Sequence, residues 1–151
     1  MKKELDLVTC SYSAYRPEMG LPVAISVGLP KWFKFPYHVV KPLAPYGIFN
    51  NEAMKEAGRG ARHAAYKQRL DIQQTDMFKQ LWDLTEMYPD VPLVMMCYEN
   101  VHKGEVCHRR WAADWFLSEH GIIVPEVSLP PQRNDNAKLL RDPEPPPLTL
   151  F

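Results

Sequence analysis

The sequence predicts an α/β domain in which a small, mostly parallel β-sheet is flanked by helices. Segments with strand and helix patterns alternate along the chain, which favours parallel pairing of the strands. The apolar run between Pro92 and Glu99 is bounded by turn signals and has the pattern of a strand buried on both faces. A length of 151 residues suits one domain. We place that domain at residues 1–128 and a flexible, Pro-rich arm at residues 129–151.

The first third of the chain predicts two strands and then an extended segment. Residues 5–10 and 23–28 are short apolar runs with β-branched residues, as strands have. Residues 11–20 between them are polar and aromatic and end in proline and glycine, which is typical of a loop. Prolines recur through residues 31–48, so regular helix is not expected there. We expect this segment to cover one face of the core.

Two helices are predicted in the middle of the chain. The first spans residues 52–70 and is weakened by Gly58 and Gly60, each by about 1 kcal/mol relative to alanine. The second spans residues 76–88, where apolar residues recur with helical spacing and Thr75 is the N-cap. We therefore expect a short break between the two helices.

The last helix has the clearest pattern, at residues 108–120, and Gly121 ends it. Its apolar stripe, which we assign to the core, consists of Trp111, Ala112, Trp115 and Phe116. Residues 122–127 predict a further strand. From residue 128 onward the chain is polar and Pro-rich, so we expect disorder.

Composition restricts the class of protein. The 18 basic and 18 acidic side chains cancel, which argues against a general polyanion binder but not against a local basic site. No apolar run reaches the roughly 18 residues of a membrane helix, and no signal peptide is evident at the N-terminus. Three cysteines are too few for a disulfide framework. We therefore expect a cytoplasmic protein with free thiols.

Candidate site residues follow the ends of the predicted strands, where ligands bind in parallel sheets. Glu99 follows the most buried strand. Cys107, His108 and Arg109 lie at the start of the last helix, whose N-terminus attracts anions and lowers the pKa of a thiol. The loop after the first strand adds Tyr12, Arg16 and Glu18. We expect all of these side chains to face one cleft.

The pair Cys97-x-Glu99 followed by Cys107-His108-Arg109 resembles the signature of a family called domain of unknown function 488. Residues 11–20 and 23–30 are similar to the variant found in actinobacteria and their phages. The resemblance covers about residues 5–127. It implies a Rossmann-like α/β fold with a polar edge and no established reaction, so a nucleotide or nucleic-acid substrate follows only by analogy of fold.

These residues predict a hydrolase or group transferase that acts on a nucleotide or a nucleic acid. The anion-binding residues are Arg16, Arg109 and Tyr12. The catalytic residues are Cys107 as nucleophile, His108 as proton shuttle, and Glu99 or Glu18 as general acid or base. A cysteine-phosphatase loop is excluded because Ala113 stands where an arginine is needed. The alternatives are a binding protein without catalysis and a small metal-binding domain.

Zinc on Cys97, Cys107 and His108 is not predicted, because their spacing is not a standard zinc pattern. We expect no cofactor: the glycine-rich phosphate loops of dinucleotide and nucleotide-triphosphate sites do not occur in the sequence.

Two basic segments are candidate nucleic-acid contacts. Helical spacing puts Arg59, Arg62 and Arg69 on one face together with Tyr66, either as a solvated basic face or as a contact with a phosphate backbone. In the extended segment, aromatic residues are interleaved with lysines at positions 31 and 34. The rings of that segment either stack on bases, with Lys31 and Lys34 near phosphates, or pack over the sheet.

The chain ends in an apolar peptide. Leu148, Leu150 and Phe151 are similar to the motif by which bacterial DNA polymerases and repair proteins bind the DNA sliding clamp, although Pro147 replaces the usual glutamine. We expect these three residues to enter a hydrophobic pocket of a partner such as that clamp, with the Pro-rich arm as a spacer. The alternative is a tail that folds back on its own domain or binds nothing.

Overall fold

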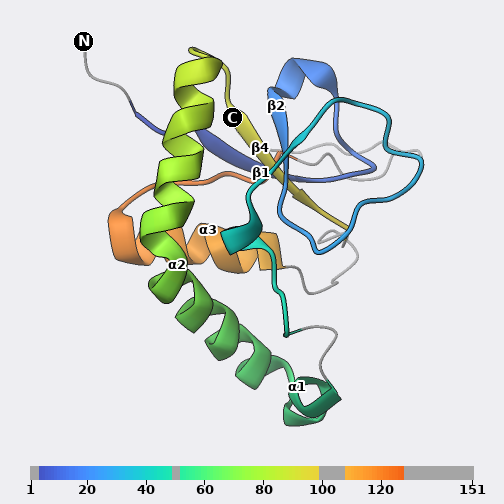
Figure 1. The fold of residues 1–151 in the computed structure, drawn as a ribbon, viewed down its shortest axis with the longest axis vertical. Helices are drawn as coiled ribbons and strands as arrows, with labels where there is room; N and C mark the ends of the chain where they lie inside the picture. The colour runs from blue at the N-terminus through green and yellow to red at the C-terminus, as the bar shows by residue number, and fades with distance from the viewer. Residues whose placement is uncertain (1–3, 49–51, 99–107, 128–151) are drawn as a thin grey trace, which may run out of the picture.

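The computed structural model describes residues 4–48, 52–98 and 108–127 (Figure 1). Its centre is a four-stranded parallel sheet in the order β1-β4-β2-β3. The strands are β1 (Leu7–Ser11), β2 (Leu21–Ala24), β3 (His38–Val39) and β4 (Leu93–Cys97). β4 is buried along its whole length between β1 and β2. The predicted α/β class and the buried strand are confirmed.

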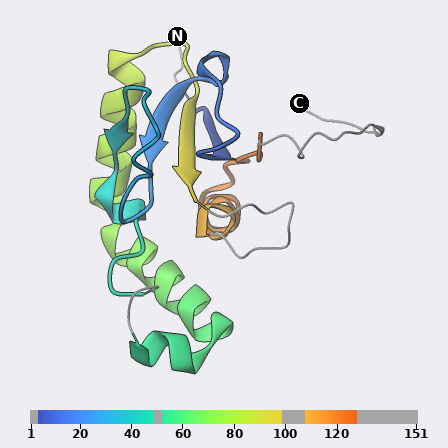
Figure 2. The same cartoon turned by 90° about the vertical axis from the view of Figure 1, so that its right-hand side faces the viewer.

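Three α-helices accompany the sheet: α1 (Glu52–Ala57), α2 (Arg59–Met87) and α3 (His108–His120). α2 and α3 pack on the same face of the sheet, which we call the helix face, and Figure 2 shows α2 along one side of it. Because side chains alternate along a strand, Leu7, Leu93 and Met95 point to this face. They join a core with Leu70 and Leu81 of α2 and with Trp115 and Phe116 of α3.

Loops cover the opposite face, which we call the loop face. Residues 11–20 contain a short 3-10 helix, η1 (Pro17–Met19), and pack there together with residues 29–37. Their buried members lie on Cys10, Ala24, Val94 and Met96 of the strands. The extended segment therefore covers one face as predicted over residues 29–37. Residues 38–48 instead form β3 and a second 3-10 helix, η2 (Lys41–Leu43), which packs against α2.

The predicted break between two central helices is wrong, because α2 is one helix across residues 71–75. Its buried residues, from Tyr66 to Leu84, form one stripe against the helix face. That burial outweighs the local N-cap signal at Thr75. The chain does break at Gly58, which has φ of +95° and separates α1 from α2, so the predicted weak point is confirmed.

α3 has the predicted bounds, and Gly121 follows it with φ of +67°. Its tryptophans and Phe116 are buried, as predicted. The predicted strand at residues 122–127 is wrong: a single parallel bridge joins Glu126 to Thr9 of β1. Pro125 has no N–H to donate, which limits pairing with β1.

Several predicted residues lie outside the described part of the chain: Glu99, Cys107, Leu148, Leu150 and Phe151, with the arm at 129–151. No helix among the described residues is long and apolar enough to cross a membrane.

Candidate functional site

The loop face carries a cluster of seven aromatic side chains, which we call the aromatic cluster. Its members are Tyr12, Tyr15, Trp32, Phe33, Phe35, Tyr37 and Tyr98. They belong to the chain segments that follow β1, β2 and β4. These segments leave the carboxyl ends of the parallel strands, the side of the sheet where ligands bind in this fold class, and their buried rings pack over the loop face.

Phe33 is the centre of the aromatic cluster. Its ring centroid lies 5.3 Å from Tyr12 and 5.4 Å from Phe35, in edge-to-face arrangements. Trp32 and Tyr37 contact the same ring at 6.5 and 6.4 Å. Such arrangements are the favoured geometry of aromatic pairs. Phe33 therefore holds the neighbouring rings in defined positions.

The buried tyrosines fix the base of the cluster by hydrogen bonds. The Tyr12 hydroxyl shares a 2.6 Å hydrogen bond with Ser26, which donates in turn to the carbonyl of Gly28. The Tyr15 hydroxyl donates to the carbonyl of Gly20 at 2.7 Å. Burial raises the pKa of Tyr15, so it remains a neutral donor. Tyr12 thus has a packing role, and its hydroxyl is already bonded within the protein.

Four rings of the cluster remain open to solvent. Their exposed fractions are 57% for Trp32, 39% for Phe35, 44% for Tyr37 and 50% for Tyr98. Each rests on a buried ring: Phe35 on Tyr15 at 5.1 Å, Tyr98 on Tyr12 at 5.3 Å, and the other two on Phe33. Exposed rings held in this way lose little conformational entropy when they bind a ligand.

Cationic side chains accompany the exposed rings. Lys31 and Lys34 are exposed within the same short segment, and Arg16 is exposed on the neighbouring loop. Arg16 donates to the carbonyl of Tyr15 at 3.0 Å. Glu18, in η1, is the acidic side chain of that loop. Of the predicted site residues, the structure therefore places Arg16, Glu18, Lys31 and Lys34 beside the aromatic cluster.

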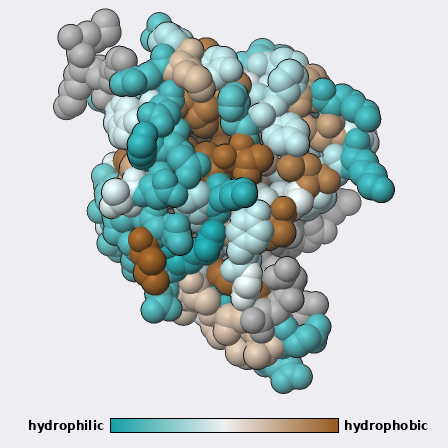
Figure 3. All heavy atoms as spheres, viewed as in Figure 1, coloured by the Kyte–Doolittle hydropathy of each residue, from teal (hydrophilic) through white to brown (hydrophobic). Residues whose placement is uncertain are grey.

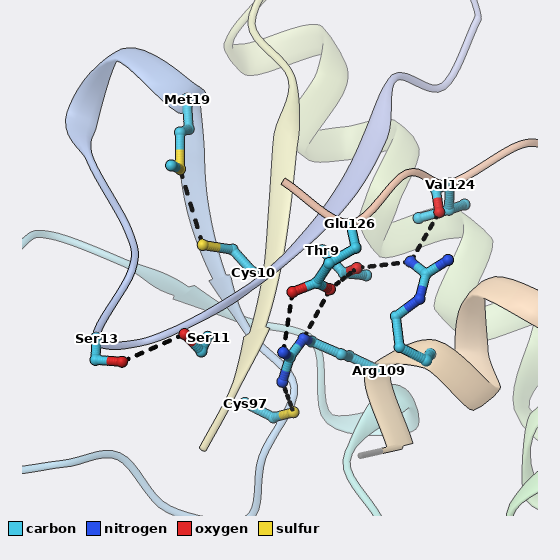
Figure 4. A network of polar contacts seen from close by, with 10 residues as sticks. Thr9, Cys10, Ser11, Ser13, Met19, Cys97, Arg109, Val124 and Glu126 are labelled. Carbon is cyan, nitrogen blue, oxygen red and sulfur yellow. Dashed lines mark hydrogen bonds and ion pairs between the residues drawn. The ribbon is translucent and has the colours of Figure 1, made fainter. Parts of the chain in front are cut away.

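Arg109 lies on the helix face, in a buried polar network (Figure 4). Its Nε and Nη2 donate to the two carboxylate oxygens of Glu126, both at 2.9 Å. Its Nη1 lies 3.1 Å from the Cys97 sulfur. A bidentate arginine–carboxylate pair is among the strongest hydrogen-bonded arrangements in proteins. The anion that Arg109 binds in this structure is therefore the carboxylate of Glu126.

Two further residues complete the network around Glu126. The Thr9 hydroxyl donates to Glu126 at 2.6 Å. Arg110 donates to Thr9 at 2.8 Å and to the carbonyl of Val124 at 2.9 Å. Burial lowers the pKa of Arg110, while the carboxylates of Glu126 and Asp114 act in the opposite direction. The network fixes the segment after α3 against β1.

The predicted cleft with two arginines does not form among the described residues. Arg16 follows β1 on the loop face, whereas Arg109 is buried on the helix face. Sequence reasoning missed Glu126 as the partner of Arg109. The sequence does contain a signal for this pair, because Glu126 is a carboxylate inside the apolar run 122–127. A charge that is buried with such a run needs a partner of opposite sign.

His108 is also buried on the helix face. Its Nε2 is bonded to the carbonyl of Ile25, and its ring meets Tyr66 edge-on at 5.4 Å. Burial, with a smaller contribution from the charge of Arg109, lowers the pKa of His108 to about 4, against the opposing effect of the hydrogen bond to Ile25. His108 is therefore neutral at pH 7, and it is separated by the sheet from Glu18.

Two cysteines fall within the described residues. Cys10 is a buried free thiol, whereas Cys97 is disulfide-bonded. The expectation of free thiols is therefore wrong for Cys97. In residues 4–48, 52–98 and 108–127, no group of three or more His, Cys, Asp or Glu side chains is placed to hold a metal ion.

The basic helix differs from its prediction. Tyr66 is buried and donates to the carbonyl of Leu43, so it does not share a solvated face. Arg69 donates to the carbonyls of Ala44 and Lys41, which ties α2 to η2. Arg59 is exposed at the start of α2. Figure 3 shows the molecular surface in the orientation of Figure 1, where hydrophilic residues surround separate apolar patches.

Comparison with known proteins adds no assignment. No family model matches the sequence, and neither a curated protein nor a solved structure matches it. The resemblance to domain of unknown function 488 stays a prediction.

Proposed function

We propose that this protein binds a nucleotide or a nucleic acid through the aromatic cluster. The observation that carries the proposal is four solvent-exposed rings, each of which contacts a buried ring. Lys31 immediately precedes Trp32, and Lys34 immediately precedes Phe35. Every base has a π-face that stacks on an aromatic side chain, and lysines attract the phosphates that accompany the bases.

Binding has more support than catalysis in the described residues. His108 and Glu18, two of the candidate catalytic groups, lie on opposite faces of the sheet. The imidazole Nε2 of His108 is also hydrogen-bonded to the backbone carbonyl of Ile25. A hydrolase or transferase activity remains a prediction that depends on Glu99 and Cys107. Recruitment to a sliding clamp likewise remains a prediction that depends on the C-terminal peptide.

Replacing Trp32 by alanine is expected to weaken nucleic-acid binding. Loss of one base–aromatic stack costs about 1–3 kcal/mol, which corresponds to about a 5- to 150-fold rise in Kd. The measurement is fluorescence anisotropy of a labelled single-stranded oligonucleotide titrated with protein. Tyr46→Ala is the matched control, because Tyr46 is exposed and its ring lies against Arg69 of α2 rather than in the aromatic cluster. Equal affinities of Trp32→Ala and the parent protein for the oligonucleotide would show that Trp32 does not contribute to binding.

Replacing Lys31 and Lys34 together by glutamine is expected to reduce the salt dependence of binding. Each phosphate neutralised on a single strand contributes about −0.7 to the slope of log K against log salt concentration. The double variant should therefore lose about 1.4 from the magnitude of that slope. Lys79→Gln, a change in an exposed lysine of α2 paired with Asp83, should leave it unaltered. An unchanged slope in the double variant argues against phosphate contacts by these lysines.

A further inference from the structure

We infer that the ligand of the aromatic cluster is a single-stranded nucleic acid whose successive bases stack on different exposed rings. This inference rests on the proposed function and specifies its ligand. It depends on the number of exposed rings and on the two separate chain segments that contain them.

The exposed rings are distributed over two segments of the chain. Trp32, Phe35 and Tyr37 follow β2, whereas Tyr98 follows β4, and the buried rings of Tyr12 and Phe33 lie between them as a bridge. A mononucleotide has one base and uses one such ring at a time. A single-stranded nucleic acid brings several bases to the aromatic cluster at once. After the first base has stacked, each additional contact is intramolecular, which multiplies the affinity.

The order of residues in the loop also suits a polymer. In residues 31–35 a lysine immediately precedes each of the two exposed rings, Trp32 and Phe35, and both lysines are exposed. A nucleic-acid strand likewise alternates phosphates with bases. In a duplex the faces of the bases are covered by their neighbours, so stacking on a side chain requires unpairing at a cost of a few kcal/mol. The aromatic cluster should therefore bind a single strand in preference to a duplex.

Anisotropy titrations of the full-length protein test this inference directly. The probes are a labelled deoxythymidine oligonucleotide of about 15 nucleotides, within the site sizes of known single-strand binders, its uridine ribonucleotide counterpart, and a blunt DNA duplex of equal length. Unlabelled thymidine monophosphate serves as competitor. We expect a Kd at least about 10-fold lower for single strands than for the duplex, and competition by the monophosphate only at far higher base concentration. The two single strands tell whether DNA or RNA is preferred.

Tyr98→Ala supplies the matching variant. It should raise the Kd for the oligonucleotides at least about 5-fold, whereas Tyr46→Ala should leave that Kd unchanged. A duplex bound as tightly as the single strand would overturn the inference and leave the proposed function in place. Competition by the monophosphate at equal base concentration would have the same effect. Absence of binding to every probe, with circular dichroism showing folded protein, would overturn both.

Discussion

Glu126→Ala is expected to lower the free energy of unfolding by about 3–5 kcal/mol, because it leaves a buried arginine without its carboxylate. The side chain of Arg109 is fully buried, and that of Glu126 is 14% exposed. The variant also removes the acceptor of the Thr9 hydroxyl. Urea denaturation followed by far-ultraviolet circular dichroism measures the change.

A double variant separates charge from packing at this site. Arg109→Met with Glu126→Leu removes both charges and restores apolar volume, and such replacements are often neutral or stabilising. We expect it to be at least about 2 kcal/mol more stable than Glu126→Ala. A loss below about 1 kcal/mol in Glu126→Ala would show that the ion pair does not hold the segment after α3 in place.

Stability is expected to fall by about 2 kcal/mol between pH 7 and pH 5 through His108 alone. The pKa of His108 is about 4 in the folded protein and about 6.5 in an unfolded chain. Between these values the unfolded state binds the extra proton, so stability declines as the pH falls. Below pH 4 the total loss approaches about 3 kcal/mol, because one pKa unit corresponds to 1.36 kcal/mol.

The variant His108→Gln isolates this contribution. Glutamine does not titrate and has an N–H that can donate to the Ile25 carbonyl. The pH dependence of its unfolding free energy should be flatter by about 2 kcal/mol between pH 7 and pH 5 than that of the parent protein. His120→Gln, a change in an exposed histidine at the end of α3, is the control. Identical pH profiles for the parent and His108→Gln would contradict the buried, neutral state of His108.

The elements that sequence patterns predicted well are those whose local and tertiary preferences agree. β4 is apolar throughout and is buried throughout, and α3 has an apolar stripe that is buried and ends at Gly121. The wrong predictions lie where the two preferences conflict. Thr75 has a cap-forming side chain, yet the stripe that includes Met77 and Leu81 keeps the helix continuous. Packing of a whole face outweighs one cap of about 1 kcal/mol.

The aromatic cluster was predicted only in part. The sequence left open whether the rings of residues 31–37 stack on bases or pack over the sheet, and the site predicted at the ends of the strands was a different one, centred on Cys107, His108 and Arg109. Whether a ring packs or is exposed depends on its neighbours: Phe33 is buried, while Trp32 and Phe35 beside it are exposed. The partner of Arg109 is Glu126, on a segment beyond α3, and such a pairing depends on tertiary structure that no local motif specifies.

The two faces of the sheet therefore differ in what their polar and aromatic side chains contact. On the helix face, Arg109 and His108 are bonded to groups of the protein itself and contribute to stability. On the loop face, rings and cations are exposed to solvent, and we propose that they bind the ligand. Substitutions on the helix face should change unfolding, whereas substitutions of exposed rings should change binding with little effect on stability.

Photo-crosslinking locates a bound nucleic-acid strand on the protein and therefore shows whether the strand lies on the aromatic cluster. The full-length protein is mixed with a single-stranded deoxythymidine oligonucleotide, irradiated, digested and analysed by mass spectrometry. We predict crosslinks at Trp32, Phe35, Tyr37 or Tyr98. Crosslinks confined to the basic start of α2, around Arg59 and Arg62, would contradict the assignment of the aromatic cluster as the binding surface.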